Sequence, residues 1–309
     1  MKRRILVTAI SGDIANGILH ILRENGVEFI VGTDINEYAV GMDQVDVFYQ
    51  CRLAIDEGYV GEMVALCKKY HITHMIPVNE REIEVISPVR GEFEALGVKM
   101  VLQSPDVLSA SLDKLKTVGF LEVAGVDVPA IVDPRRGKVS RFGQGYIVKP
   151  RKSNGSRGIR RVDSVGECTD GEIVQEYVPG DEYTVGVFSD GTVTNVIKFK
   201  RQLKNGLSYL VELSHDESIE ATARKVARAF DLRGYVNVQL RKFDGGNYVF
   251  EINPRISGTV RFRHMLGFND VLWWLDYLDG NKVPEYADAY DRAVGIRELN
   301  DKYLIKVAR

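Results

Sequence analysis

Two strand-like runs joined by a short polar linker constrain the fold of this chain more than any other feature. The first run is Tyr235–Arg241, and the linker Lys242–Asn247 has the glycine, asparagine and aspartate content of a hairpin turn. Side chains on a strand alternate between its two faces, so on the second run Glu251 and Asn253 point the same way. The pattern predicts an antiparallel hairpin with one polar face.

The polar face of this hairpin carries oxygen ligands. Folding the two runs together can bring Gln239 beside Glu251 and Asn253, while Phe250 and Ile252 are expected to point into the core. One carboxylate and two amide oxygens suit magnesium, which binds few protein groups and keeps positions for waters and substrate phosphates. The hairpin therefore indicates the metal end of a nucleotide site.

Basic residues on either side of this hairpin fit the phosphates of a nucleotide. Lys149 lies on the strand-like run Tyr146–Pro150, and the Gly/Ser-containing loop Arg151–Ile159 follows. Small residues let backbone N–H groups approach phosphate oxygens, and the ammonium supplies charge, although an exposed basic turn has the same composition. Arg255, just past the hairpin, carries a planar, permanently charged fork that matches a phosphoryl group.

A third motif, Val174–Tyr183, has the composition of a hinge between two lobes. An apolar strand end is followed by a turn at Pro179–Gly180 and a carboxylate at Glu182. Exposed backbone at Tyr177 and Val178 can pair with the edge of a planar heterocycle, and the carboxylate can accept hydrogen bonds from ribose hydroxyls. Taken singly, each of these elements also fits an ordinary strand–turn–strand.

Two common nucleotide-binding fingerprints are missing from the sequence. The Gly137–Lys138 pair is followed by Val139 and lacks the earlier glycine of a GxxxxGK[ST] loop. The glycines at 143 and 145 are followed by Val148, where a GxGxxG motif needs its third glycine. The expected site is therefore neither a P-loop nor a standard dinucleotide fingerprint.

Composition bounds the class of protein and its partners. The 309 residues suffice for two or three domains, and a net charge of −2 gives no basic field to hold nucleic acid. No run approaches the roughly 20 apolar residues of a membrane span. Cys51, Cys67 and Cys168 have neither metal-site nor disulfide spacing. We therefore expect a cytoplasmic protein that acts on small molecules, with neither nucleic acid nor membrane as a partner.

The first 103 residues alternate strand-like and helix-like segments, which predicts a parallel sheet with helices on both faces. The expected strands are Lys2–Ala9, Phe29–Thr33, Thr73–Val78 and Lys99–Leu102, and the expected helices are Ile14–Asn25, Glu62–Tyr70 and Arg81–Leu96.

The rest of the chain reads as an α+β fold. Ser104 can cap a helix that has Pro105 at its first position, and a second helix is expected over Ser111–Ala124. A mixed segment continues to residue 178. Beyond it we expect strands over Tyr183–Phe188, Val193–Phe199 and Leu207–Glu212, and helices over Glu217–Phe230 and Val271–Leu278.

Taken in order, these motifs resemble the ATP-grasp superfamily of carboxylate–amine and carboxylate–ammonia ligases. The resemblance covers essentially the whole chain, and it is nearest to carbamoyl-phosphate-synthase-large-chain-like proteins of the amino-acid-ligase type. It implies a pre-ATP-grasp α/β domain over residues 1–103, followed by a two-lobed ATP-grasp fold. The implied lobes are a small lid subdomain with its leading helices over 104–178 and a large C-terminal subdomain over 179–309.

The resemblance also implies roles for individual residues. The implied phosphate-binding residues are Lys114, Lys149 and the lid-loop residues Asn154, Gly155, Ser156 and Gly158. The implied adenine and ribose contacts are Glu176, Tyr177, Val178 and Glu182. The implied magnesium ligands are Gln239, Glu251 and Asn253, and Arg255 lies near the transferred phosphoryl group. Many members carry an acidic residue where Gln239 stands, whereas the synthase-like branch carries glutamine.

The function that the resemblance implies is an ATP- and Mg²⁺-dependent ligase, with Mn²⁺ as an alternative metal. A substrate carboxylate attacks the γ-phosphorus to form an acyl phosphate, and an amine then displaces phosphate to give an amide. Such chemistry depends on positioning and charge neutralisation and needs no protein nucleophile. The alternatives are a catalytically silent nucleotide-binding module, a kinase, or carbamoyl-phosphate-type chemistry. Residue identities leave both substrates open, and they leave a homodimer open as well.

Three weaker candidates lie outside these motifs. Arg201 and Lys204 could reach phosphates or a substrate carboxylate, or could belong to a solvated face. Ser257–Thr259 could bind substrate oxygens through backbone N–H groups. Glu80 follows a parallel strand, at the edge where α/β sheets place ligands.

Overall fold

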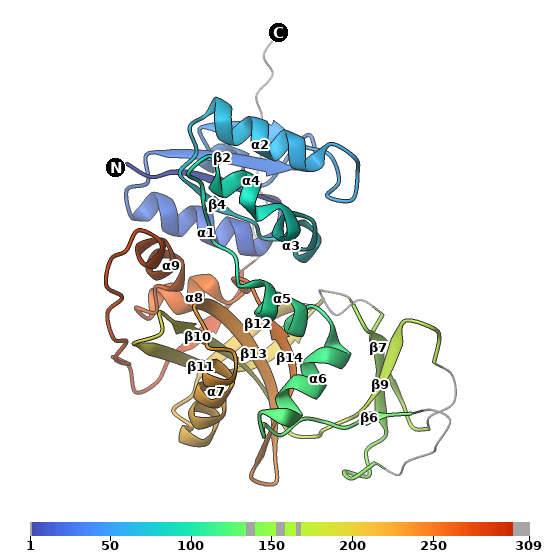
Figure 1. The fold of residues 1–309 in the computed structure, drawn as a ribbon. Helices are drawn as coiled ribbons and strands as arrows, with labels where there is room; N and C mark the ends of the chain where they lie inside the picture. The colour runs from blue at the N-terminus through green and yellow to red at the C-terminus, as the bar shows by residue number, and fades with distance from the viewer. Residues whose placement is uncertain (1, 134–139, 153–157, 165–167, 299–309) are drawn as a thin grey trace. The chain divides into compact units, whose positions relative to one another are not determined.

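The computed structural model describes residues 2–133, 140–152, 158–164 and 168–298 (Figure 1). The chain divides into two compact units. The first unit comprises the residues up to Leu102, the segment Ile256–Val283 and the residues from Arg297. The second comprises Gln103–Arg255 and Pro284–Ile296. In the part of the chain that the structure describes, no helix is long and apolar enough to span a bilayer.

The first unit is built on a five-stranded parallel sheet in the order β3-β2-β1-β4-β5. The strands are β1 (Arg4–Val7), β2 (Phe29–Asp34), β3 (Val47–Gln50), β4 (His74–Ile76) and β5 (Lys99–Met100). The predicted parallel sheet is confirmed. Strand β3 was not expected, because this edge strand is only partly buried and therefore lacks the continuous apolar run of a central strand.

Helices cover both faces of this sheet, and α1 and α2 lie on opposite faces in Figure 1. The helices are α1 (Asp13–Glu24), α2 (Tyr59–Lys69), α3 (Glu80–Ile86) and α4 (Arg90–Glu94). Short 3₁₀ turns cover Met42–Gln44 and Ser87–Val89. The single helix expected over Arg81–Leu96 is wrong, because Pro88 has no N–H to donate and its ring blocks the preceding turn.

The segment Ile256–Val283 groups with the first unit, although we expected it in a C-terminal subdomain over 179–309. It forms α8 (Val260–Met265) and α9 (Asp270–Leu278), and both contact α1. The approach to α8 is close: a Cβ at Gly17 would lie 2.5 Å from Val260 Cγ1. The lack of a side chain at this position therefore permits the contact.

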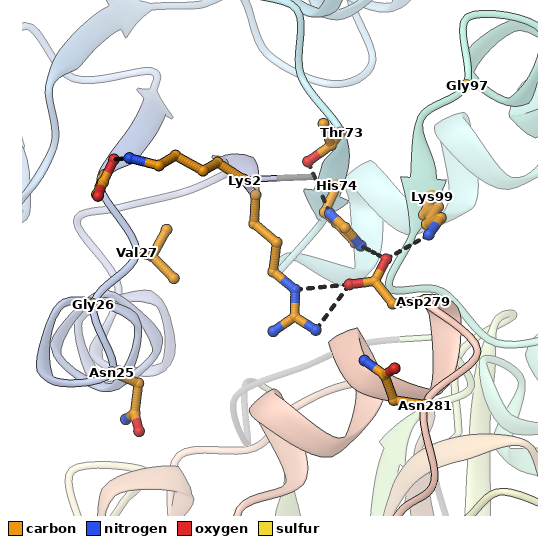
Figure 2. A pocket seen from close by; sticks show the side chains of 12 residues that line it. Lys2, Asn25, Gly26, Val27, Thr73, His74, Gly97, Lys99, Asp279 and Asn281 are labelled. Carbon is orange, nitrogen blue, oxygen red and sulfur yellow. Dashed lines mark hydrogen bonds and ion pairs between the residues drawn. The ribbon is translucent and has the colours of Figure 1, made fainter.

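A pocket of about 610 Å³ lies at the amino ends of β1, β4 and β5 (Figure 2). His74 and Lys99 point toward Asp279, which follows α9. The Asp279 carboxylate accepts hydrogen bonds from His74 Nε2 at 3.1 Å, from Arg3 Nε at 2.8 Å and from Lys99 Nζ. Burial alone would raise the pKa of Asp279, but the hydrogen bonds from Lys99 and Arg3 outweigh it and lower that pKa. We name Asp279, Arg3, His74 and Lys99 the α9 tie.

The second unit contains a six-stranded antiparallel sheet in the order β14-β13-β10-β11-β12-β15 and a four-stranded sheet in the order β6-β9-β7-β8. The large sheet consists of β10 (Asp181–Ser189), β11 (Thr194–Lys204), β12 (Leu207–Leu213), β13 (Gly234–Phe243), β14 (Gly246–Asn253) and β15 (Val294–Ile296). The small sheet consists of β6 (Ile131–Val132), β7 (Tyr146–Pro150), β8 (Arg160–Val162) and β9 (Glu172–Glu176). A boundary at 178/179 inside this unit stays a prediction.

Three helices share the main core of the second unit with the large sheet. They are α5 (Pro105–Ser111), α6 (Lys114–Val123) and α7 (Glu217–Ala229). Ser104 caps α5 as expected, since its Oγ accepts a hydrogen bond from Val107 N. Asp216 caps α7 in the same way. Alternate residues of β13 and β14, such as Val238, Leu240 and Ile252, belong to this core, so the intervening residues face the other way.

Candidate functional site

The face of the large sheet that points away from the helices carries the predicted polar residues in register. Gln239 on β13 is directly opposite Glu251 on β14, and Asn237 is opposite Asn253. Thr184 on β10 flanks Gln239 on its other side, and its Oγ1 donates to Asn237 Oδ1 at 2.7 Å. The hairpin inferred from alternation thus brings Gln239, Glu251 and Asn253 to one face.

A β-bulge changes the position of Phe250. The register shifts between Gln239 and Leu240, so that Leu240 pairs with Val249 and Phe250 has no direct partner. Phe250 lines a cavity together with Glu251. The expectation that Phe250 points into the core is wrong, because strict alternation fails where one strand has an extra residue.

Lys149 on β7 lines the same cavity from the small sheet. Its side chain is buried, and its Nζ donates to Phe250 O at 3.2 Å. Burial lowers the pKa of Lys149 to about 8; nearby Glu251 raises it, and nearby Lys114 lowers it further. Because few waters solvate the charge of this buried lysine, an anion placed beside it would interact with it strongly.

The cavity has a volume of about 380 Å³ and is bounded by strands of both sheets. Its apolar lining consists of Pro129, Ile147, Ile159, Val178, Leu203 and Phe250. Its polar lining consists of Lys149, Gln175, Glu176, Tyr177, Glu182, Arg201, Gln239, Arg241 and Glu251. An apolar pocket with a few convergent polar groups is the usual form of a small-molecule site.

The hinge residues offer a ligand different groups from those that the sequence predicted. The Glu176 carboxylate accepts from Arg141 N at 2.7 Å, from Arg141 Nε at 2.8 Å and from Ala130 N at 3.2 Å. Tyr177 N donates to Gly145 O at 3.1 Å, so its N–H is not exposed for a heterocycle as expected. Val178 N–H, which has no hydrogen-bond partner among the described residues, is the better-placed donor.

Glu182 is held by two arginines. Arg201 Nε donates to Glu182 Oε1 at 2.8 Å, and Arg241 Nη2 donates to Glu182 Oε2 at 2.8 Å. Sequence reasoning named Arg201 only as a weaker candidate and missed Arg241. The missing signal is strand order: β10 lies between β11 and β13, which places one residue from each neighbour beside Glu182, and no local pattern reports that order.

The other predicted residues lie near this cavity but do not line it. Lys114 is the first residue of α6, and its N–H donates to Arg151 O at 3.1 Å. Asn253 is buried and accepts from Arg255 Nη2 at 3.3 Å. Gly158 is exposed with φ of +72°. The predicted lid-loop residues Asn154, Gly155 and Ser156 lie outside the described residues.

The donor set on the polar face fits a magnesium ion. Gln239, Glu251 and Asn253 offer one carboxylate and two amide oxygens, and such oxygen donors suit Mg²⁺ when phosphates and waters supply the remaining ligands. Within the ranges that the structure covers, no three His, Cys, Asp or Glu side chains gather into another metal-binding group.

Two family models match the chain. The model of the ATP-grasp domain matches residues 111–259, and the model of the PylC-like N-terminal domain matches residues 5–101. The first covers the polar face and the cavity, and the second covers the parallel sheet.

Two curated relatives share sequence with the chain. A 3-methyl-D-ornithine–L-lysine ligase of Methanosarcina acetivorans is 27% identical over 199 residues, which cover 62% of this chain and 51% of the relative. The arginine-specific carbamoyl phosphate synthase large chain of Bacillus subtilis is 24% identical over 181 residues, 52% of this chain and 17% of the relative. The chain thus matches about half the length of the first relative and less than a fifth of the second.

Solved structures share the fold. The biotin carboxylase domain dimer of Hydrogenobacter thermophilus 2-oxoglutarate carboxylase, in complex with MgADP, has a TM-score of 0.71 at 17% identity and covers 93% of this chain and 72% of that chain. An L-amino acid ligase from Bacillus licheniformis has a TM-score of 0.67 at 16% identity, with coverage of 90% and 75%. At these identities the likeness concerns the fold alone.

Proposed function

Because residues 111–259 match the ATP-grasp domain model, we propose that this chain is an ATP- and Mg²⁺-dependent ligase that joins a small-molecule carboxylate to an amine. One observation carries the proposal. The buried ammonium of Lys149 and the paired side chains of Gln239 and Glu251 line one cavity of a size suited to a nucleotide. The cytoplasmic location expected from the sequence remains part of the proposal, and the oligomeric state stays open between a monomer and a homodimer.

The cavity supports a nucleotide oriented along the large sheet. Val178 N–H and the apolar lining would hold the base, and Glu182 would accept from the ribose while two arginines fix its carboxylate. Lys149 would contact the phosphates, because its charge is poorly solvated before they bind. Lys114 is close enough to affect the pKa of Lys149, so a second ammonium would add to the same charge.

Gln239, Glu251 and Asn253 would hold the magnesium ion, and Arg255 would contact the transferred phosphoryl group. A bound Mg²⁺ neutralises charge on the phosphate oxygens. Arg255 Nη2 donates to Asn253 Oδ1 at 3.3 Å, so this guanidinium lies beside the proposed metal ligands and would release that oxygen when it contacts the phosphoryl group. These residues act by orientation and charge, since phosphoryl transfer requires no covalent bond to the protein.

The proposed reaction has two steps. A carboxylate oxygen of the first substrate attacks the γ-phosphorus, the bond to the bridging oxygen of ADP breaks, and an acyl phosphate forms. The amine nitrogen of the second substrate then attacks the acyl carbon, phosphate leaves, and the nitrogen loses a proton to give the amide. Exclusion of water would protect the acyl phosphate, as a closed cavity does.

The names of two compared proteins narrow the substrate class. One is a 3-methyl-D-ornithine–L-lysine ligase and the other an L-amino acid ligase. We therefore extend the proposal to an amino acid as at least one of the two substrates. The other relative, a carbamoyl phosphate synthase, makes bicarbonate with ammonia the pair to test alongside.

The test is a matrix of carboxylates and amines, incubated with ATP and Mg²⁺ and scored by phosphate release and by mass detection of product. The expected result is one or more pairs in which ADP and an amide appear together and depend on both substrates. Glu251→Gln is the matched inactive control. ADP release that is indifferent to every carboxylate would contradict the ligase assignment, and nucleotide binding without any turnover would favour a silent binding module.

A further inference from the structure

Arg201 connects two residues to which the proposed function gives different tasks. Its Nε and Nη2 lie 2.8 Å and 2.7 Å from Glu182 Oε1, the proposed ribose acceptor. The same Nη2 donates to Gln239 Oε1, a proposed metal ligand, at 2.8 Å. The Arg201 side chain is only 9% exposed, so this guanidinium is fixed within the cavity wall.

The contact between Arg201 and Gln239 affects whether the Gln239 oxygen can bind a cation. A guanidinium has donors only, so the Gln239 amide must turn its oxygen toward Arg201. That oxygen is also the atom that a divalent cation would take. A cation bound there would lie next to a permanent positive charge that is shielded from water. Metal and guanidinium would both bind this one oxygen, and the repulsion between their like charges disfavours simultaneous binding.

We propose that Arg201 makes the metal site conditional on nucleotide. In the free protein its guanidinium occupies Gln239 Oε1 and disfavours a divalent ion. A nucleotide adds the negative charge of its phosphates, and a metal that arrives with it can then take the oxygen. Arg201 keeps its two contacts to Glu182, so only the Gln239 side chain has to turn. The inference rests on the proposed function and names a positioning residue for it.

Arg241 supplies a matched control within the same cavity. It donates to Glu182 Oε2 at 2.8 Å and to Gly180 O at 3.1 Å, and its Nη1 lies 3.4 Å from the Tyr177 hydroxyl. No contact of Arg241 with Gln239 is present among the described residues. Replacing Arg241 therefore removes a positive charge and a Glu182 partner while leaving the Gln239 oxygen occupied.

The test measures Mn²⁺ binding by electron paramagnetic resonance, with and without a non-hydrolysable ATP analogue. Wild-type protein should bind Mn²⁺ weakly alone and much more tightly with the analogue. Arg201→Met should tighten binding to the free protein by roughly tenfold, a typical coupling between sites, and should shrink the effect of the analogue. Arg241→Met should change Mn²⁺ binding to the free protein by less than about threefold, because the charge of Arg241 acts on the metal site only at longer range.

Arg201→Lys separates the contact from the charge. It keeps a positive charge but loses the fork that spans Glu182 and Gln239, so it should also tighten Mn²⁺ binding. Wild-type behaviour of Arg201→Lys, or equal shifts for Arg201→Met and Arg241→Met, would overturn the inference and leave the ligase proposal intact. Wild-type protein that binds neither analogue nor Mn²⁺ with it would overturn both proposals. Circular dichroism of each variant checks that the fold is retained.

Discussion

The buried ammonium of Lys149 is one of the charged groups that line the cavity. Lys149 lies against the backbone of Phe250, and burial lowers its pKa to about 8. Near neutral pH the group is mostly charged and poorly solvated. An anion that reaches it replaces missing water, which is why we assign the phosphates to this residue.

Lys149→Ala should weaken ATP binding by at least about tenfold, since a charged hydrogen bond contributes roughly 1.5–3 kcal/mol. Isothermal titration calorimetry with ATP and Mg²⁺ measures the effect. Lys200→Ala is the matched control, because Lys200 lies on β11 of the large sheet and pairs with Asp181 at 2.8 Å outside the cavity lining. Equal affinities of wild type and Lys149→Ala would remove the phosphate role.

Glu251→Gln should nearly abolish Mg²⁺-dependent turnover and leave the fold intact. The amide has the same size but removes the one carboxylate of the proposed ligand set, and hard cations depend on that charge. Phosphate release reports turnover, and thermal unfolding reports the fold. Glu212→Gln, an exposed change on β12, should leave both unchanged. Wild-type turnover in Glu251→Gln would refute the metal assignment.

Strand alternation explains which site residues sequence could predict. Gln239, Glu251 and Asn253 share a face because alternation along one hairpin puts them there. Phe250 departs from that rule at a bulge, and a bulge has no reliable signal in these residues. The arginines around Glu182 depend on the lateral order of three strands, which is decided by tertiary packing.

At the scale of elements, residues that cap or break helices explain where several helices begin and end. Ser104 with Pro105 starts α5 as predicted. Pro88 divides a segment whose apolar spacing alone suggests one long helix. Strands β3 and β15 were not predicted. Both are short edge strands with little burial, so they lack the apolar pattern on which the prediction depends.

The Asp216 cap of α7 gives a prediction at this scale. Its carboxylate accepts from the N–H groups of Ser218 and Ile219 and pairs with Lys242. Asp216→Ala should lower the free energy of unfolding by about 1 kcal/mol at neutral pH, the usual cost of losing a cap. Denaturant unfolding measures it. Glu37→Ala, which removes an exposed carboxylate, is the control and should be neutral.

The same cap should show a defined pH dependence. Burial raises the pKa of Asp216, but hydrogen bonds from Lys242 and Ser218 outweigh it and lower that pKa to about 2. A carboxyl group whose pKa is lower in the folded state than in the unfolded state stabilises the fold at pH values above its unfolded pKa, which is about 4. The difference between wild type and Asp216→Ala should therefore shrink as pH falls from about 4 toward 2. A difference that is constant over that range would contradict the ionic part of the cap.

At the scale of the whole molecule, the chain leaves the first unit after Leu102 and returns to it at Ile256. The alternating pattern up to residue 103 predicted the first passage. The return could not be predicted, since the apolar residues of α8 and α9 do not specify which of the two units these helices join. Within the first unit, polar contacts hold this returning segment at the α9 tie and at the pair of Arg261 with Glu24.

Asp279→Asn tests the α9 tie. The amide keeps the shape but loses the charge that three basic side chains share, so the free energy of unfolding should fall by about 2 kcal/mol. Chemical unfolding at neutral pH measures the loss. The pKa of Asp279 is lowered in the folded state, so the loss should diminish as pH falls below about 4. Asp106→Asn, on the exposed first turn of α5, is the control.

The close approach of α8 to Gly17 of α1 has a consequence for biosynthesis. Helix α1 is translated before the helix that packs beside Gly17, which begins only at Val260. A nascent chain must therefore keep an apolar face of α1 uncovered while the segment Gln103–Arg255 is translated, and such exposure invites misassembly or chaperone capture. A fragment that ends at Leu102 should accordingly be aggregation-prone rather than a usable domain.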